Sequence, residues 1–261
     1  MNIVGRVDSL WRYPVKSMGG EPLAAAFVGF SGIYGDRIYA FRSTAQPAGF
    51  PFLTGREQAQ MLLYRPRFRQ PDKAAEPVNL AAAEALGPGV TPLFAEPGEL
   101  AVDVEVPTGE VLAIDDPALL DRLGGGPGSL ALLRSDHRAL TDCRPISLFG
   151  LGTARQLAAE VGSAVDARRF RANIYADLGA EAGFAEDGFV GRRVRLGAKV
   201  ELAILERDPR CKMITLDPDT AAANPEILRR VARGHDGKAG VYGAVLVEGM
   251  VRPGDDIALL D

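Results

Sequence analysis

The stretch Val-Gly-Arg-Arg-Val-Arg-Leu-Gly-Ala-Lys-Val-Glu-Leu-Ala-Ile, residues 190–204, indicates how this chain folds. Val200, Leu202 and Ile204 alternate with Glu201 and Ala203, which is the period of a β-strand with one buried face. Residues 190–196 predict a strand directly before it, and residues 169–175, 240–247 and 257–260 predict further strands. Many short strands with turns at close intervals favour a closed or nearly closed barrel, which leaves few unpaired strand edges.

The first half of the chain shows the same preference for short strands. Residues 3–10, 33–42 and 100–114 predict strands, the last range with a hairpin turn at Thr108-Gly109. Residues 70–98 are dense in Pro, Ala and Gly and predict a surface excursion with one short helix around 80–86. Further helices are predicted over 117–123, over 147–161 and from Asn224-Pro225 onward. The fold class is therefore mainly β with a few helices (α+β).

Composition excludes several classes of protein. The 261 residues carry a net charge of -4, with an isoelectric point near 5.4, so nucleic-acid binding driven by bulk charge is not expected. The chain has no apolar run long enough to span a membrane. Two cysteines and the absence of a secretory signal favour the reducing cytoplasm, and the abundance of Ala, Gly and Arg favours a bacterial source.

Cys211 is the residue whose chemistry stands out, because it follows Asp208-Pro209-Arg210 after a predicted strand and only Cys143 accompanies it. A thiolate is a soft metal ligand and a nucleophile that can carry sulfur as a persulfide. One thiol cannot build a four-sulfur metal site, so Cys211 would either complete the coordination of a metal that brings other ligands or act as a covalent carrier. An inert buried cysteine is the alternative.

Five motifs in the chain occur in the order seen in MOSC-domain proteins. They are Tyr-Pro-Val-Lys-Ser (13–17), Gly-Asp-Arg (35–37), Arg-Phe-Arg-Ala-Asn-Ile (169–174), Phe-Ala-Glu-Asp-Gly-Phe-Val-Gly (184–191) and Arg-Cys (210–211). The sequence resembles this family, the molybdenum cofactor sulfurase C-terminal domain family, which includes the mitochondrial amidoxime reducing component. The resemblance covers nearly the whole chain. Residues 1–115 resemble the MOSC N-terminal β-barrel domain, and residues 116–261 resemble the MOSC domain.

The resemblance implies a β-barrel that binds molybdenum cofactor, a pterin whose dithiolene supplies two soft sulfurs to the metal. Cys211 would be the protein's molybdenum ligand and its catalytic residue, in a cationic recess built from both halves of the chain. The remaining cofactor-binding residues that the resemblance implies are Lys16, Ser17, Arg37, Thr54, Arg56, Arg171 and Asn173. Arg37 and Arg171 would bind phosphate oxygens through two parallel hydrogen bonds, and Asn173 would bind the polar edge of the pterin.

Each of these residues also has a purely structural interpretation. Arg168, Arg169 and Arg171 could form a solvated strand face, since charged residues are mostly exposed. Lys16 and Ser17 could be ordinary turn residues, and Asp36 with Arg37 could be a surface ion pair. Cys143 could line the site, but an inert role is favoured.

Three functional hypotheses remain. The first is an oxidoreductase that removes oxygen from N-hydroxylated or N-oxide substrates at molybdenum. The second is a sulfur carrier or cofactor-handling protein that uses a Cys211 persulfide, and the third is a small-molecule-binding barrel without turnover. Either of the first two requires a small-molecule substrate or acceptor and a separate electron-donor or sulfur-donor protein, because the chain has too few cysteines for an iron–sulfur domain and is too short to include a desulfurase. Neither a nucleic acid nor a membrane is expected as a partner.

Overall fold

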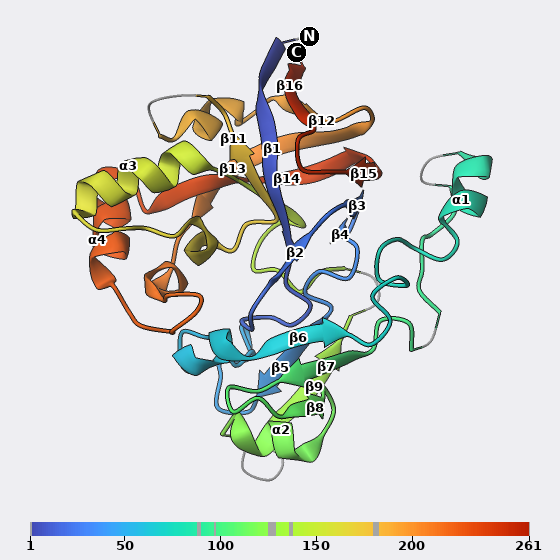
Figure 1. Cartoon of the computed structure of the whole chain (residues 1–261), viewed down its shortest axis with the longest axis vertical. Coiled ribbons are helices and arrows are strands. Elements are labelled where there is room, and N and C mark those ends of the chain that lie inside the picture. The colour runs from blue at the N-terminus through green and yellow to red at the C-terminus, as the bar shows by residue number, and fades with distance from the viewer. Residues whose placement is uncertain are drawn as a thin grey trace. The chain divides into compact units, whose positions relative to one another are not determined.

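A computed structural model describes residues 2–87, 90–96, 98–124, 129–135, 138–179 and 183–260 of the chain (Figure 1). The chain divides into two compact units, which are described separately. The barrel unit comprises Met1–Trp11, Pro22–Ile33 and Asp142–Asp261, and the second unit comprises Arg12–Glu21 and Tyr34–Thr141. Neither unit is continuous in sequence, so the units differ from the division at residue 115 that the sequence predicts.

Seven strands close into a barrel in the first unit. Their order around the barrel is β11 (Ile174–Asp177), β10 (Ile146–Gly150), β14 (Lys238–Val247), β13 (Val200–Pro209), β12 (Arg193–Leu196), β16 (Asp256–Leu260) and β1 (Asn2–Arg12). The pairing of β1 with β11 completes the ring. A further short strand, β2 (Glu21–Leu23), pairs with β1. The inward-facing side chains of these strands form one apolar core, which includes Val7, Leu10, Val194, Leu202 and Val241. Closure leaves few strand edges open for unwanted pairing.

Gly5 lies where β1 approaches β11, with Arg6 opposite Asp177. A Cβ atom on Gly5 would overlap the carbonyl oxygen of Asp177 and would lie 2.8 Å from the Cα atom of Leu178. Both of these are backbone atoms, which cannot swing aside as a flexible side chain would. Only glycine therefore allows this approach of the two strands that close the barrel.

We expect Gly5→Ala to lower the free energy of unfolding by about 1–3 kcal/mol, the usual cost of forcing extra atoms into a packed site. The measurement is the denaturant midpoint of unfolding. Gly188→Ala is the matched control, because a Cβ atom at Gly188 would have no heavy atom of another residue within 4 Å. If the two variants have the same midpoint, the close approach at Gly5 does not limit closure.

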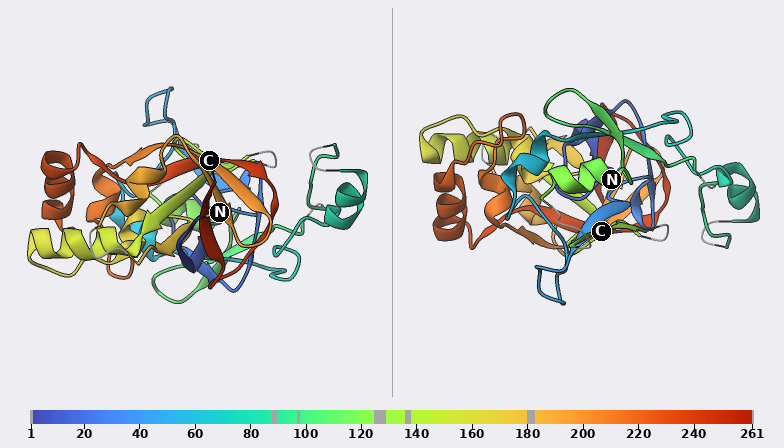
Figure 2. Two further views of the ribbon diagram at one scale, coloured as in Figure 1. Left: turned by 90° about the horizontal axis from the view of Figure 1, so that it is seen from above. Right: turned by 90° about the horizontal axis from the view of Figure 1, so that it is seen from below.

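Two helices and a second apolar cluster lie on the outside of the barrel. Helices α3 (Leu151–Val161) and α4 (Pro225–Gly234) lie side by side in both views of Figure 2. With the 3-10 turns η2 (Ala167–Phe170) and η4 (Lys212–Thr215), they cover a cluster in which the rings of Phe149 and Phe170 stack at 4.2 Å. The unit also contains η3 (Ala185–Phe189) and a small sheet. That sheet consists of β15 (Gly249–Val251), β3 (Ala26–Gly29) and β4 (Gly32–Ile33).

The second unit has its own core beneath two small antiparallel sheets. One pairs β5 (Tyr39–Ser43) with β9 (Leu130–Arg134), and the other contains β6 (Arg65–Phe68), β7 (Val102–Glu105) and β8 (Val111–Ala113). Its helices are η1 (Ala59–Leu63), α1 (Leu80–Leu86) and α2 (Pro117–Arg122). The core includes Val15, Met18, Phe41, Met61 and Leu119, all nearly inaccessible to solvent. In the described part of the chain, no helix has the length and apolar character needed to cross a membrane.

The predicted fold class is confirmed, since the chain is mainly β with a closed barrel and few helices. Three segment predictions are wrong in part. Residues 147–150 belong to strand β10 rather than to the start of a helix, because they lie fully buried between β11 and β14. Residues 34–38 form turns rather than a continuous strand, and residues 169–173 form the end of η2 and an irregular segment. Arg171 and Asn173 therefore lie outside any strand, before β11 begins at Ile174.

Candidate functional site

Cys211 lies in the barrel unit, directly after strand β13. It has extended backbone and caps the N-terminus of η4, whose residue Ile214 donates its N–H to the Cys211 carbonyl at 3.2 Å. The thiol is free of any disulfide and is half-buried. A covalent or metal-binding role is therefore possible, and the alternative of a fully buried, inert cysteine does not fit this exposure.

Arg210, the residue before Cys211, has a side chain that is only 8% exposed and that makes two hydrogen bonds and an ion pair. Its Nε atom donates to the carbonyl oxygen of Ala239 at 2.7 Å, and Nη1 donates to that of Phe170 at 2.8 Å. Nη2 lies 2.6 Å from a carboxylate oxygen of Asp208, whose side chain is only 2% exposed. This guanidinium therefore connects the end of β13 to η2 and to the start of β14.

Arg169 and Arg171 lie at the end of η2, the element that Arg210 contacts. The side chain of Arg169 is 9% exposed and donates to the carbonyl oxygen of Thr215 at 2.7 Å and to Asp217 at 2.9 Å. Arg171 is half-buried and has left-handed backbone with a φ of 51°. The interpretation of this arginine run as a solvated strand face is therefore wrong, because Arg169 is buried and none of the run is strand.

Asn173 is buried and has a structural role in the barrel. Its side chain donates to the carbonyl oxygen of Trp11 at 3.3 Å, and its Oδ1 atom accepts from the Ser147 hydroxyl at 3.2 Å. The same hydroxyl accepts from the Asn173 backbone N–H at 3.1 Å. Asn173 thus joins β1 and β10 just before β11 begins, and its contact with a pterin stays a prediction.

Lys16 and Ser17 are buried in the second unit, at 6% and 5% exposed. Lys16 Nζ donates to the carbonyl oxygen of Leu140 at 2.8 Å and lies 5.4 Å from the ring centroid of Phe50. Ser17 has a left-handed backbone with a φ of 67°. A solvated turn does not account for these two residues, because both are shielded from water and the lysine ammonium lies among aromatic rings.

Arg37 is held near Lys16 by a small network. The Leu140 backbone N–H donates to the Arg37 carbonyl at 2.8 Å, and Lys16 contacts the carbonyl of the same leucine. The Arg37 guanidinium lies 2.5 Å from Asp36 and 4.6 Å from the ring centroid of Tyr13. Asp36 is 1% exposed and accepts the Tyr13 N–H at 2.8 Å, so the prediction of a surface ion pair is wrong.

Thr54 and Arg56 lie beside the same phenyl ring as Lys16. The Arg56 guanidinium carbon is 4.3 Å from the ring centroid of Phe50, and its Nε atom donates to the Thr54 hydroxyl at 3.2 Å. That hydroxyl donates to Glu57 at 2.6 Å. In the second unit, Lys16 and Arg56 thus share Phe50, and Lys16 and the Arg37 backbone share Leu140.

Unusual backbone conformations mark the same positions. Among the described residues, six that are not glycine have a positive φ, and Ser17, Arg37 and Arg171 are three of them. A left-handed conformation costs an ordinary residue of order 1–3 kcal/mol and persists where the surroundings enforce it, often at functional sites. The left-handed backbone is observed at these three predicted site residues, whose binding roles stay predictions, and no sequence signal other than the family motifs pointed to these positions.

Arg169 and Arg210 lie in the family motifs, but the sequence did not indicate that their side chains connect segments, because they do so through backbone carbonyls far away in the chain. Cys143 is exposed, and its sulfur lies 3.6 Å from a carboxylate oxygen of Glu206. Partial burial, with the Glu206 charge, raises the pKa of the Cys143 thiol, which lowers its reactivity. This setting supports the favoured inert role.

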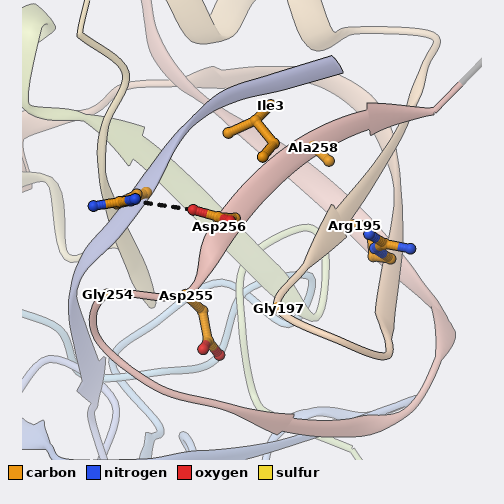
Figure 3. A pocket seen from close by; sticks show the side chains of 8 residues that line it. Ile3, Arg195, Gly197, Gly254, Asp255, Asp256 and Ala258 are labelled. Carbon is orange, nitrogen blue, oxygen red and sulfur yellow. Dashed lines mark hydrogen bonds and ion pairs between the residues drawn. The ribbon is translucent and has the colours of Figure 1, made fainter. Parts of the chain in front are cut away.

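A separate hollow of about 470 Å³ lies in the barrel unit between β1, β12 and β16 (Figure 3). It is lined by Ile3, Arg6, Arg195, Gly197, Gly254, Asp255, Asp256 and Ala258. Arg6 and Asp256 form an ion pair of 3.1 Å, and the lining contributes two arginines and two aspartates. None of the predicted site residues lines this hollow, and its balanced charges do not favour an anionic ligand.

Two family models match the chain. The model of the MOSC domain matches residues 135–258, and that of the MOSC N-terminal beta barrel domain matches residues 4–88. The chain belongs to the MOSC-domain family. MOSC domains take their name from the C-terminal domain of molybdenum cofactor sulfurases, so the family is associated with this cofactor.

Solved structures similar to this MOSC protein share little sequence with it. The YUAD protein from Bacillus subtilis is 14% identical, with 98% of this chain and 94% of that chain covered and a TM-score of 0.48. YiiM from Geobacillus stearothermophilus is 19% identical, and YiiM from Escherichia coli is 15% identical. Each YiiM alignment covers 45% of this chain and 55% of the other, with TM-scores of 0.36 and 0.33. No curated protein matches the chain.

Proposed function

We propose that this MOSC protein binds molybdenum cofactor through Cys211 and reduces N-hydroxylated or N-oxide substrates. The observation that carries the proposal is the setting of Cys211. It is a half-buried thiol outside any disulfide, at the family's Arg-Cys motif and beside a rigidly bound arginine. A soft sulfur ligand in a fixed position is what a molybdenum centre requires of the protein.

The residues present fit a metal that arrives with ligands of its own. Among the described residues, no group of three or more His, Cys, Asp and Glu side chains is placed to hold a bare metal ion. A dithiolene brings two sulfurs, so one cysteine is enough to complete the sulfur ligation. The lone Cys211 therefore suits this cofactor better than it suits zinc or an iron–sulfur cluster.

The cationic group of the second unit suits the cofactor's phosphate. Lys16 supplies a point charge, whereas Arg37 and Arg56 supply planar guanidinium groups that can form two parallel bonds to phosphate oxygens. Lys16 is shielded from bulk water, which strengthens its interaction with an anion. Ser17 and Thr54 add hydroxyl donors. This assignment supports a phosphate-bearing ligand and names the residues that would bind it.

In the proposed reaction, the bound cofactor supplies the two-electron redox chemistry. Cys211 would hold the metal, and Arg171 and the cations of the second unit would neutralise anionic groups of the cofactor. Electrons would come from a separate donor protein.

A sulfur carrier is the second candidate. The half-buried Cys211 can be reached by a sulfur donor, as a persulfide carrier requires. In that case Cys211 would carry the sulfur and a separate protein would supply it.

The test is metal and pterin analysis of protein made in a cofactor-producing host. We expect stoichiometric molybdenum in the wild type, its loss in Cys211→Ser, and its retention in the control Cys143→Ser. Lys16→Ala should also release pterin, because the metal and the phosphate belong to one molecule. Reduction of a simple amidoxime with an artificial electron donor would identify the reductase. A persulfide on Cys211 without turnover identifies the carrier. Full molybdenum content in Cys211→Ser contradicts the reductase, and the absence of any persulfide on Cys211 contradicts the carrier.

A further inference from the structure

Two buried arginines connect the segment that carries Cys211 to the segment that carries Arg171, and they do so in opposite directions. Arg210, next to Cys211, donates to the carbonyl of Phe170, which is next to Arg171, at 2.8 Å. Arg169, two residues before Arg171, donates to the carbonyl of Thr215, four residues after Cys211, at 2.7 Å. Each segment thus contributes one guanidinium donor and one carbonyl acceptor to the pair of cross-links.

Each cross-link has further anchors that limit its motion. The Arg210 guanidinium also binds the carbonyl of Ala239 and the buried carboxylate of Asp208, and it lies 5.3 Å from the ring centroid of Phe170. Arg169 also pairs with Asp217 at 2.9 Å. A guanidinium held by two hydrogen bonds and an ion pair has far less freedom than a lysine ammonium, which is a flexible point charge.

We propose that Arg169 and Arg210 are positioning residues that together hold the Cys211 thiol in a fixed relation to the Arg171 cation. The inference rests on the proposed function, because the fixed arrangement would serve to present one sulfur ligand and one anion-binding cation to a single rigid cofactor. Neither arginine needs to touch that cofactor. Arg171, whose backbone is left-handed with a φ of 51°, directly follows Arg169 and Phe170, the two residues that the cross-links anchor.

A purely structural role would predict only lower stability in variants of these arginines. A positioning role also predicts that the reactivity of the Cys211 thiol changes in variants that stay folded. The Cys211 thiolate should react faster with an anionic reagent when a cation is held beside it, because positive charge raises the local concentration of anions. Removal of either cross-link should weaken this preference even though Arg171 itself is intact.

The experiment compares alkylation of Cys211 by iodoacetate and by iodoacetamide in metal-free protein. Cys143→Ser serves as the background, so that Cys211 is the only thiol. The ratio of the two rates cancels the thiolate fraction, since both reagents attack the thiolate. We expect Arg171→Gln to lower the ratio by about tenfold, at the low end of the rate effects that charged clefts exert. Arg210→Lys and Arg169→Lys should each lower the ratio of the iodoacetate rate to the iodoacetamide rate nearly as much as Arg171→Gln does.

The control is Arg230→Lys, because Arg230 binds Glu160 on α3 at 2.8 Å and does not connect the two segments. It should leave the ratio unchanged. Circular dichroism and the melting temperature identify folded variants, and Arg169→Lys provides a second test if Arg210→Lys does not fold. An unchanged ratio in the folded lysine variants, or in Arg171→Gln, overturns the proposal. The alkylation experiment uses metal-free protein, so it can confirm the positioning even if the protein never binds molybdenum. Failure of the positioning proposal is therefore distinguishable from failure of the proposed function.

Discussion

Replacement of Asp36 by alanine should lower the free energy of unfolding by about 3–5 kcal/mol, the usual cost of removing one partner from a buried ion pair. Asp36 is 1% exposed and lies 2.5 Å from Arg37 Nη1. Its other carboxylate oxygen accepts the Tyr13 backbone N–H. Alanine would remove an acceptor from the largely buried Arg37 guanidinium and from the Tyr13 N–H, and both losses are costly. The measurement is chemical denaturation followed by circular dichroism.

Asp36→Asn separates the charge from the hydrogen bonds. Its Oδ1 atom can still accept from the Tyr13 N–H, so hydrogen exchange at Tyr13 should stay slow in Asp36→Asn and become fast in Asp36→Ala. The charge opposite Arg37 is lost in both. Equal stability of wild type and Asp36→Ala would show that this pair does not hold the Gly35-Asp36-Arg37 turn in place.

Glu186→Ala should cost about 3 kcal/mol, because it leaves buried donors without an acceptor. Helix α3 begins after Gly150, which has no side chain to cap it. Glu186, 1% exposed, accepts the Gly150 N–H at 3.1 Å and the Thr153 hydroxyl at 2.8 Å. A carboxyl group from η3 thus caps a helix distant in sequence. Thermal unfolding of wild type, Glu186→Ala and Glu186→Gln provides the measurement.

Glu186 also predicts a pH dependence. Burial, the largest cause, raises the pKa of this carboxyl group above its usual value of 4.5. The folded protein therefore keeps the proton at pH values where the unfolded chain has lost it. This contribution to stability is complete below 4.5 and is lost as the pH rises through the raised pKa. We expect the wild type to lose stability relative to Glu186→Gln over that range. A stability difference between the two that does not vary with pH would contradict the burial effect.

Much of the fold was predictable because the barrel strands have a strong periodic signal. The alternation over 200–204 predicted the beginning of β13, and the apolar run over 240–247 lies within β14. The strand predicted over residues 169–173 is wrong, and the pattern favoured it because arginines alternate there with apolar residues, as they would in a strand. In the structure, Asp166 caps a 3-10 turn by accepting the Arg168 N–H at 2.8 Å, and Arg171 then adopts the left-handed conformation. That conformation depends on distant contacts, which periodicity does not report.

The candidate site was predictable in residue type but not in how its residues are supported. The motif pattern indicated Lys16, Arg37 and Cys211, and the structure connects Lys16 with Arg56 at Phe50 and with the Arg37 backbone at Leu140. The roles of Arg210 and Asn173 depend on backbone carbonyls of residues remote in sequence. A sequence shows which side chains are charged, but which carbonyl lies opposite them is determined only when the barrel closes.

The position of β1 between β16 and β11 has a consequence for synthesis on the ribosome. Strand β1 (Asn2–Arg12) must pair with β16 (Asp256–Leu260), which is synthesised much later. A chain grows at roughly 5–20 residues per second, so β1 waits for about 10–50 s before β16 exists. During that time its backbone offers an open template to other nascent chains. We therefore expect the yield of native protein from cell-free translation to rise when a chaperone that shields exposed strands is added.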